Sequence, residues 1–223
     1  MSNYYSNHLS ALRLKRCYDI APPRIQQYMN AELKFVLSRI KKGNKVLDLG
    51  CGYGRIIPQL AQKAGIIVGI DISPENIQYG QKYMENIPNC HLMEMDAANL
   101  MFPDNNFDVV VCIQNGISAF KVDPSQLLSE SIRVTKPGGK ILFSTYSTKI
   151  WIERLEWFRL QADEGLLGEI DEDKTGNGVI TCKDGFKATT FSPEEFQKLT
   201  ATFNVITNIV EIDKSSLFCE ITT

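Results

Sequence analysis

The sequence predicts an α/β fold in which helices cover both faces of a mostly parallel sheet. Short β-branched runs alternate with helical stretches over residues 45–147, and this alternation is typical of parallel strands joined by crossover helices. Two strand-like runs then follow one another near the C-terminus, which predicts a hairpin. The expected result is a doubly wound, seven-stranded sheet with one antiparallel strand near the C-terminus.

Each expected strand is a short apolar run that ends at a turn or a helix signal. The expected strands cover residues 46–49, 66–71, 91–95, 107–113, 140–145, 203–212 and 216–221. Ser73 and Asp123 each precede a proline, so each is expected to cap a helix that begins at that proline. Ser192 and Glu195 are expected to form a capping box for a helix through Leu199.

The chain has 223 residues, 43% of them hydrophobic, which suits one domain with a single large core. Four parts are expected within this domain. They are a helical N-terminal cap (1–43), a central core (44–149), an insertion (150–191), and a C-terminal helix and hairpin (192–223).

Composition disfavours several classes of partner. The 26 acidic residues slightly outnumber the 24 basic ones, so no overall positive charge is available to hold nucleic acid. No apolar run approaches the ~20 residues of a membrane span, and the N-terminus is polar where a signal peptide would be apolar. The six cysteines are scattered, as is typical of reduced thiols. We therefore expect a soluble, cytoplasmic protein without a nucleic-acid or membrane partner, either a monomer or a homodimer.

The segment VLDLGCGYGR, residues 46–55, joins a buried strand to a glycine-rich turn. Glycine lets the backbone turn sharply and approach a ligand that a Cβ would obstruct. A dinucleotide site of the GxGxxG type, counted from Gly50 and Gly52, requires a third glycine where Arg55 stands. The turn has instead the pattern DxGxGxG, which begins at Asp48 and ends at Gly54.

This pattern resembles motif I of the class I S-adenosylmethionine-dependent methyltransferases. Two further segments agree with the resemblance, residues 95–117 with an acid, an FPD turn and FDVV, and residues 133–147 with a PGG turn before a strand. The resemblance covers roughly residues 45–147 and implies a Rossmann-like sheet. It also implies S-adenosyl-L-methionine as cofactor and S-adenosyl-L-homocysteine as product.

The resemblance assigns a carboxylate to each part of the cofactor. Asp48 would help to position the methionine part within the turn, and Asp71 at the end of the second strand would accept the ribose hydroxyls. Asp96 would accept from the adenine amino group, and the main-chain amide of Ala97 would contact the ring. The expected cofactor-binding residues are Asp48, Leu49, Gly50, Cys51, Gly52, Tyr53, Gly54, Arg55, Asp71, Ile72, Asp96, Ala97, Ile113 and Gln114.

Methyl transfer depends chiefly on alignment of donor and acceptor, so a catalytic base is optional. The candidate catalytic residues are Gln114, Asn115 and Tyr18, and the candidate substrate residues are Tyr5, Tyr18 and Asn115. The sequence IQNG at 113–116 lacks the Asn/Asp-Pro-Pro-Tyr/Phe motif that related enzymes use for planar nitrogens, which disfavours DNA-adenine and protein-glutamine acceptors. His8 is a weaker candidate than these, and His91 is expected to be packed or exposed.

Two segments outside the resemblance are expected to shape an acceptor pocket, the N-terminal segment and the insertion. Trp151 and Trp157 of the insertion have helical spacing, which equally predicts that they pack a helix on the sheet. The acidic stretch 169–173 lacks a calcium-loop pattern and is expected to be a solvated loop, and no metal site is expected.

The sequence therefore predicts a methyltransferase that acts on a small-molecule acceptor by in-line displacement. Three alternatives remain open: a protein that binds S-adenosylmethionine without transferring methyl, a methyltransferase with a protein substrate, and a nicotinamide dehydrogenase, which Arg55 disfavours.

Overall fold

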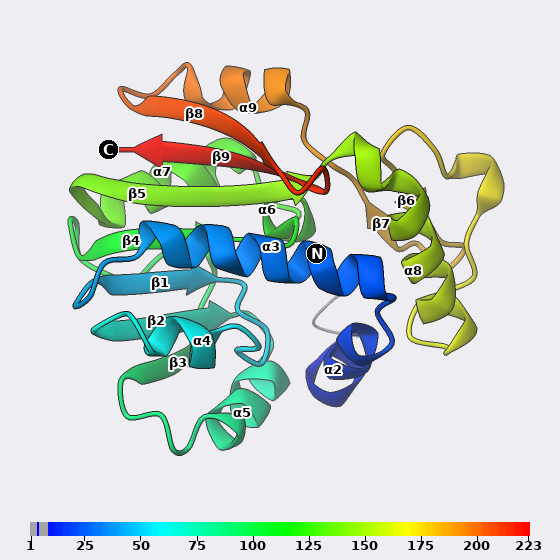
Figure 1. Cartoon of the computed structure of the whole chain (residues 1–223), viewed down its shortest axis with the longest axis horizontal. Coiled ribbons are helices and arrows are strands. Elements are labelled where there is room, and N and C mark those ends of the chain that lie inside the picture. The colour runs from blue at the N-terminus through cyan, green and yellow to red at the C-terminus, as the bar shows by residue number, and fades with distance from the viewer. Residues whose placement is uncertain (1–3, 5–8) are drawn as a thin grey trace.

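A computed structural model describes Tyr4 and residues 9–223, and its main sheet has seven strands in the order β3-β2-β1-β4-β5-β9-β8 (Figure 1). The strands of this sheet are β1 (Lys45–Leu49), β2 (Ile66–Asp71), β3 (Cys90–Glu94), β4 (Phe107–Cys112), β5 (Thr135–Tyr146), β8 (Ile206–Ile212) and β9 (Ser216–Thr222). β9 pairs antiparallel with both β5 and β8, whereas the other pairs are parallel. The predicted fold class, with its single antiparallel strand, is confirmed.

The helices begin largely where the sequence predicts. They are α2 (Ala11–Asp19), α3 (Pro23–Arg39), α4 (Ile57–Ala61), α5 (Pro74–Tyr83), α6 (Gly116–Ala119), α7 (Pro124–Val134), α8 (Trp151–Asp163) and α9 (Pro193–Thr200). Ser73 caps α5, Asp123 caps α7, and Ser192 with Glu195 forms the predicted capping box of α9. These side chains satisfy main-chain amides that have no partner within the first helical turn.

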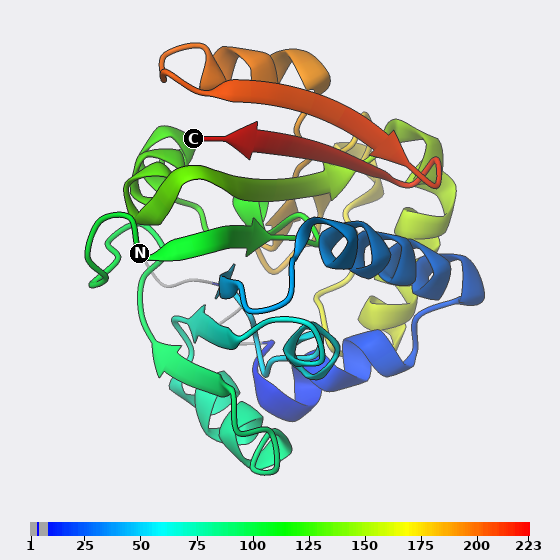
Figure 2. The ribbon, with the colours of Figure 1, turned by 60° about the vertical axis from the view of Figure 1, so that its left-hand side comes forward.

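Alternate strand residues face two separate hydrophobic layers. Val46 and Val109 pack on one face with residues of α3, α4 and α5, whereas Leu47 and Val110 pack on the other with residues of α7 and α9. Because strand side chains alternate between faces, each central strand is buried on both sides, as a parallel sheet requires. Figure 2 shows the twisted sheet between these layers.

The PGG segment is not a turn before the fifth strand, as the sequence predicts, but part of β5. β5 begins at Thr135, five residues before the expected start at Lys140, and its register with β4 shifts between Phe107 and Val109. Gly138 lies within this irregularity with a φ of 75°. Glycine tolerates that left-handed conformation, so the strand absorbs the extra residues as a bulge. The strand expected at 203–212 also differs, since β8 begins only at Ile206.

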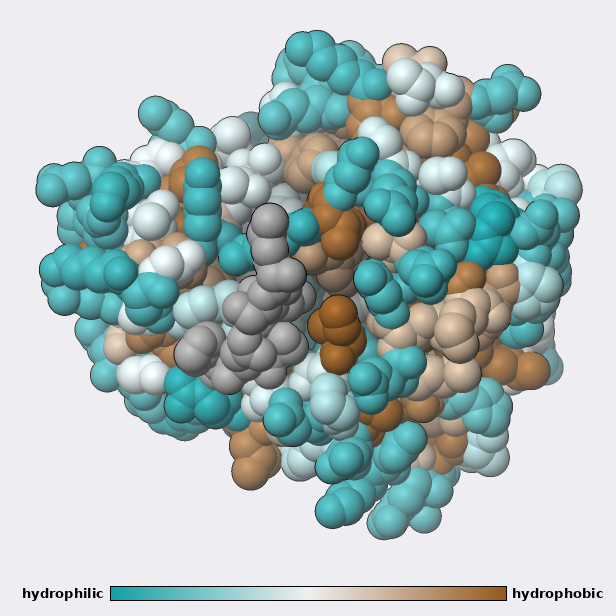
Figure 3. Space-filling model, turned by 180° about the vertical axis from the view of Figure 1, so that it is seen from behind, coloured by the Kyte–Doolittle hydropathy of each residue, from teal (hydrophilic) through white to brown (hydrophobic). Residues whose placement is uncertain are grey.

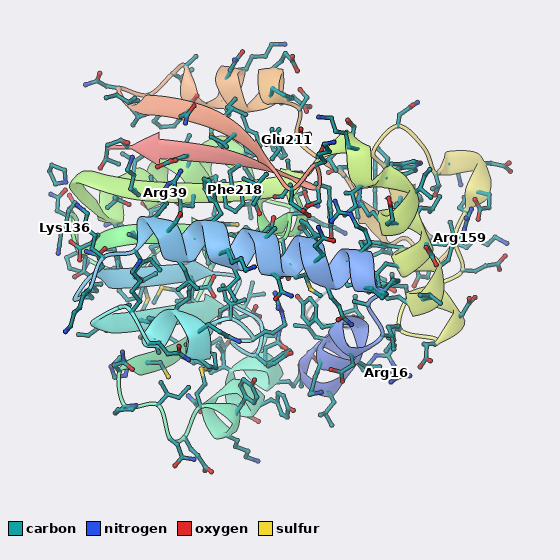
Figure 4. The ribbon with its side chains drawn as sticks, viewed as in Figure 1. Arg16, Arg39, Lys136, Arg159, Glu211 and Phe218 are labelled. Carbon is teal, nitrogen blue, oxygen red and sulfur yellow. The ribbon has the colours of Figure 1, made fainter. Side chains whose placement is uncertain are left out.

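The insertion and the N-terminal cap pack together beyond the carboxyl ends of the central strands. The insertion contains α8, a 3-10 turn (Glu172–Lys174), and a small hairpin of β6 (Ile180–Thr181) and β7 (Lys187–Ala188). Arg16 of α2 pairs with Glu164 at 2.9 Å, and its side chain projects toward the end of α8 (Figure 4). The indole nitrogen of Trp157 donates to the carbonyl of Cys17 at 2.9 Å. These bonds fix α2 to α8.

Helix α3 lies across one face of the sheet and is anchored at its far end. Arg39 pairs with Glu220 of β9 at 3.1 Å, and Figure 4 shows its side chain beside Phe218. The Phe35 ring lies 4.3 Å from the Phe218 ring, between centroids. Among the described residues, no helix is long and apolar enough to span a membrane.

Candidate functional site

A cavity of about 470 Å³ lies at the carboxyl ends of β1, β2 and β4. In an open parallel sheet this edge is where ligands bind, because loops and helix starts converge there. The cavity is lined by thirteen of the fourteen cofactor-binding residues that the sequence predicts, namely Asp48, Leu49, Gly50, Cys51, Gly52, Tyr53, Arg55, Asp71, Ile72, Asp96, Ala97, Ile113 and Gln114. Seen from the side opposite to Figure 1, the surface is largely hydrophilic, with hydrophobic residues grouped near the centre (Figure 3).

The glycine turn after β1 forms one wall of this cavity. Gly50 and Gly52 have φ angles of 68° and 57°, a region that other residues rarely adopt. A Cβ on Gly50 would lie 2.6 Å from the Phe120 ring, and a Cβ on Gly52 would lie 2.8 Å from the Leu14 side chain. Both positions therefore favour glycine by conformation, and an added Cβ would require the side chain of Phe120 or Leu14 to move. Gly54 differs from the prediction, since it does not line the cavity and packs against Met84.

Asp71 connects the end of β2 with the glycine turn. Its Oδ2 accepts from the Gly52 amide at 2.9 Å, and its Oδ1 accepts from the Ser73 amide at 2.9 Å and from Asn76 Nδ2 at 3.1 Å. Burial raises the pKa of Asp71, and these donors oppose that rise. The carboxylate is held in one orientation in the cavity wall.

Asp48 is the more deeply buried acid, with 3% of its surface exposed. Burial raises its pKa to about 7; the nearby charge of Arg55 opposes this rise, and the charge of Asp71 adds to it. A carboxylate with a pKa near neutrality has a strong preference for a cationic partner, because an added positive charge offsets its lost hydration. The floor of the cavity therefore favours a ligand that carries positive charge.

The wall beyond β2 and β3 combines apolar side chains with one acid. Ile72, Met95 and Ala97 line it, as does Asp96. Asp96 is exposed, and its Oδ1 accepts from the Ala98 amide at 2.8 Å, which closes a tight turn. A flat apolar ring with a polar edge would suit this wall.

Arg55, Tyr18 of the N-terminal cap and Tyr53 of the glycine turn form another part of the lining. The Arg55 guanidinium lies 4.6 Å from the Tyr18 ring centre, and the Tyr18 ring lies 6.3 Å from that of Tyr53. All three line the cavity. Stacking of this kind orients a guanidinium while leaving its edge available for hydrogen bonds.

Gln114 and Asn115 follow β4 but have different surroundings. Gln114 lines the cavity, whereas Asn115 does not. The Asn115 side chain donates to the Thr189 carbonyl at 2.8 Å and accepts from the Thr145 hydroxyl at 2.7 Å. Both ends of its amide join the core to the insertion, which favours a structural role over the substrate or catalytic role that the sequence predicts.

Several lining residues were not foreseen. Leu9, Leu14, Asn76, Phe120 and Val122 belong to this group. Asn76 stands three residues after the helix cap Ser73 and five residues after Asp71, the acid at the end of β2. This short separation in sequence could have indicated that Asn76 lies beside Asp71. The apolar residues carry no sequence signal that separates them from core residues.

The insertion, expected to shape an acceptor pocket, contributes no described residue to the cavity lining. Trp157 and Phe158 lie in a hydrophobic cluster with Cys17 and Tyr28, so these rings pack helices together. Tyr5 and His8 lie outside the described residues. His91 is exposed on β3, and within Tyr4 and 9–223 no group of three or more His, Cys, Asp or Glu residues is arranged to hold a metal.

A family model described as a methyltransferase domain matches residues 46–139, which include the glycine turn, Asp71 and the Gln114 turn. Within this match the chain is similar to the S-adenosylmethionine-dependent methyltransferases. The residues of the cavity fit S-adenosylmethionine, because the buried carboxylate of Asp48 would be a partner for a cationic methionine part and the partly buried carboxylate of Asp71 for ribose hydroxyls, and apolar side chains would border a flat ring.

The proteins that are similar to this chain include several methyltransferases. An arsenite methyltransferase from Aquipseudomonas alcaligenes is 28% identical over 196 residues, covering 76% of this chain and 55% of the relative. A ubiquinone biosynthesis O-methyltransferase from Coxiella burnetii is 31% identical over 115 residues, covering 51% of this chain and 48% of the relative. The chain thus spans about half the length of these curated relatives. A SAM-dependent methyltransferase structure from Aquifex aeolicus has the same fold, with a TM-score of 0.64 at 16% identity, covering 94% of this chain and 98% of that one.

Proposed function

We propose that this protein binds S-adenosyl-L-methionine in the cavity and transfers its methyl group to a small-molecule acceptor. The observation that carries the proposal is the placement of two carboxylates, buried Asp48 and partly buried Asp71, against a glycine turn in one cavity. A bound S-adenosylmethionine would supply an electrophilic methyl group on a sulfonium. The acceptor forms a bond to this carbon as the carbon–sulfur bond breaks, which leaves S-adenosylhomocysteine.

The chain's own residues would bind and align the two reactants. Asp71, held by Gly52, Ser73 and Asn76, would accept the ribose hydroxyls, and ionised Asp48 would face the cationic methionine part. Alignment of this kind supplies much of the rate gain when a reaction joins two bound groups. Gln114 would border the methyl group from the end of β4.

Three observations favour a small acceptor. The net charge is −2, and Leu9, Leu14 and Tyr18 of the N-terminal segment border the cavity, whose whole volume of about 470 Å³ is of small-molecule size. Two relatives are named for small molecules, arsenite and the ubiquinone pathway. We propose further that the chain forms one domain, made of the N-terminal cap (1–43), the core (44–149), the insertion (150–191) and the C-terminal helix and hairpin (192–223). We also propose that it acts in the cytoplasm.

The test is a turnover assay with purified protein and S-adenosylmethionine labelled on the methyl group, incubated with the small-molecule fraction of a cell extract. Label in a new small molecule, with matching release of S-adenosylhomocysteine, is the expected result. Binding of both cofactor forms by calorimetry without any turnover would instead indicate a protein that only binds the cofactor. Label in the protein fraction alone would indicate a protein acceptor, and no binding at all would overturn the proposal.

A further inference from the structure

Glu32 of α3 is a fully buried carboxylate, with 0% of its surface exposed, and it does not line the cavity. A buried carboxylate is costly unless donors compensate it. The compensation comes from the segments that surround the end of β4. Glu32 Oε2 accepts from the main-chain amide of Gln114 at 3.0 Å, and Glu32 Oε1 accepts from the hydroxyl of Ser216 at 2.6 Å.

The main-chain amide of Gln114, which donates a hydrogen bond to Glu32, belongs to a strained turn. Gln114 and Asn115 have φ angles of 56° and 63°, so two successive residues with a Cβ occupy the left-handed region. Residues with a Cβ are strained in this region, asparagine less than most, and they persist there only where the surroundings hold them. Ser144 also accepts from the Gln114 amide, at 2.9 Å, and Asn115 is held through its side chain.

This turn determines where Gln114 meets the cavity. Gln114 lines the cavity, and its side-chain Nε2 is a buried donor with no hydrogen-bond partner among the described residues. A small rotation of the main chain at Gln114 would move the side-chain amide of Gln114 relative to a ligand in the cavity. Glu32 thus acts on the cavity through one hydrogen bond to the main chain, from a helix that lies outside the family match at 46–139.

We propose that Glu32 is a positioning residue for the transfer reaction, which holds the left-handed turn of Gln114 so that the Gln114 side chain borders the acceptor. The proposal rests on the proposed function. It assigns the N-terminal helix α3 a role in transfer itself, in addition to its packing on the sheet.

The test compares Glu32→Met with Glu32→Gln. Methionine keeps much of the volume but cannot accept the Gln114 amide well, whereas glutamine retains one carbonyl oxygen for it and can donate its amide to Ser216. With the extract fraction that supports wild-type turnover, Glu32→Met is expected to lower kcat about tenfold or more, because alignment is lost. Its affinity for S-adenosylhomocysteine should stay within about threefold of the wild type, and Glu32→Gln should restore most of kcat.

Glu220→Met is the matched control. Glu220 is also a buried carboxylate, but its partners are Arg39 and Lys140, and none of these three residues lines the cavity. This variant should lose thermal stability without losing kcat. Unchanged kcat in folded Glu32→Met, or an equal loss of kcat in Glu220→Met, would overturn the proposal, because Glu32 would then have only a structural role.

A second measurement does not depend on turnover. The amide proton of Gln114, followed by NMR of labelled protein, should lie downfield in the wild type because it donates to a carboxylate, and it should move upfield in Glu32→Met. No difference between the two proteins would contradict the contact on which the proposal depends. If the wild type binds S-adenosylhomocysteine but transfers no methyl, the proposed function fails together with the role in transfer, while this resonance still shows whether Glu32 holds the turn.

Discussion

Asp71 accepts a hydrogen bond from the main-chain amide of Gly52 at 2.9 Å, which joins the acid at the end of β2 to the glycine turn after β1. The two features that define the candidate site in the sequence are therefore one structural unit. A change in either residue is transmitted to the other, because the bond connects the carboxylate directly to the backbone of the turn.

Asp71→Asn should weaken S-adenosylhomocysteine binding at least about tenfold, because hydrogen bonds to a charged group are worth roughly 1.5–3 kcal/mol. Asp71 now accepts hydrogen bonds from the amides of Gly52 and Ser73 and from Asn76 Nδ2. The NH2 group of an asparagine at position 71 would face one or more of these donors and could not accept from them. Calorimetric titration measures the affinity. Asp108→Asn is the matched control, since Asp108 also lies on a central strand but bonds Lys45 and Lys136. Equal affinity in wild type and Asp71→Asn would contradict the assigned ribose contact.

Asp48 should make binding of S-adenosylmethionine depend on pH. Its pKa is about 7, so the ionised fraction increases as the pH rises from about 6 to about 8, and the affinity for a sulfonium should increase by up to about tenfold per pH unit below the pKa. S-adenosylhomocysteine carries no sulfonium and should show a smaller dependence. The measurement is the ratio of the two dissociation constants across this pH range.

Asp48→Asn supplies the control for this titration, because it removes the ionisable group and should make the ratio independent of pH. In the wild type without ligand, the free energy of unfolding should change with pH in the opposite direction to the affinity. The folded-state pKa of Asp48 lies above its ordinary value of 3.8, so the folded protein binds the extra proton, and stability should fall as the pH rises from about 4 to about 7. A ratio that is flat with pH in the wild type would show that Asp48 does not face the sulfonium.

Gly52→Ala should reduce both stability and cofactor affinity. The left-handed conformation costs an alanine roughly 1 kcal/mol, and the added Cβ would lie 2.8 Å from the Leu14 side chain in the cavity wall. Gly43→Ala separates the two effects, since Gly43 has a φ of 87° but no atom within 4 Å of an added Cβ. Thermal unfolding should detect a loss in both variants, and calorimetry a loss of affinity only in Gly52→Ala. Equal affinities would mean that Leu14 adjusts without cost.

Trp157→Phe should destabilise the protein by about 1–3 kcal/mol, because it removes the bond to the Cys17 carbonyl and leaves space in a buried cluster. It should leave cofactor affinity and the KM for the acceptor unchanged, since Trp157 does not line the cavity. Trp151→Phe, at a partly buried position, should cost less. A large change in acceptor KM without loss of stability would instead support the acceptor-pocket role considered for the insertion.

The sheet and much of the cavity lining could be predicted from local sequence alone. Strand residues such as Val46 and Val109 are apolar because both faces are covered, and Ser73, Asp123 and Ser192 mark helix starts through bonds to residues two or three positions away. Glycines with required left-handed conformations are also local. Thirteen of the fourteen predicted residues line one cavity because parallel strands end at the same edge of the sheet.

Contacts between distant segments could not be predicted in this way. Asn115 bonds Thr189, Trp157 bonds Cys17, and Glu32 bonds both Gln114 and Ser216, pairs that are separated by dozens of residues or more in the chain. Nothing in the composition around Glu32 distinguishes it from a solvated helix residue.

The sequence by itself thus determined the fold class, the resemblance to methyltransferases and the three carboxylates that line the cavity, because periodicity, capping and glycine conformation act over a few residues. Only the tertiary structure decided that the insertion supports the N-terminal cap without entering the cavity, and that Glu32 reaches the turn of Gln114. The physical reason is that a buried polar group takes whichever partner the packed chain brings within about 3 Å, and that partner has no fixed separation in sequence.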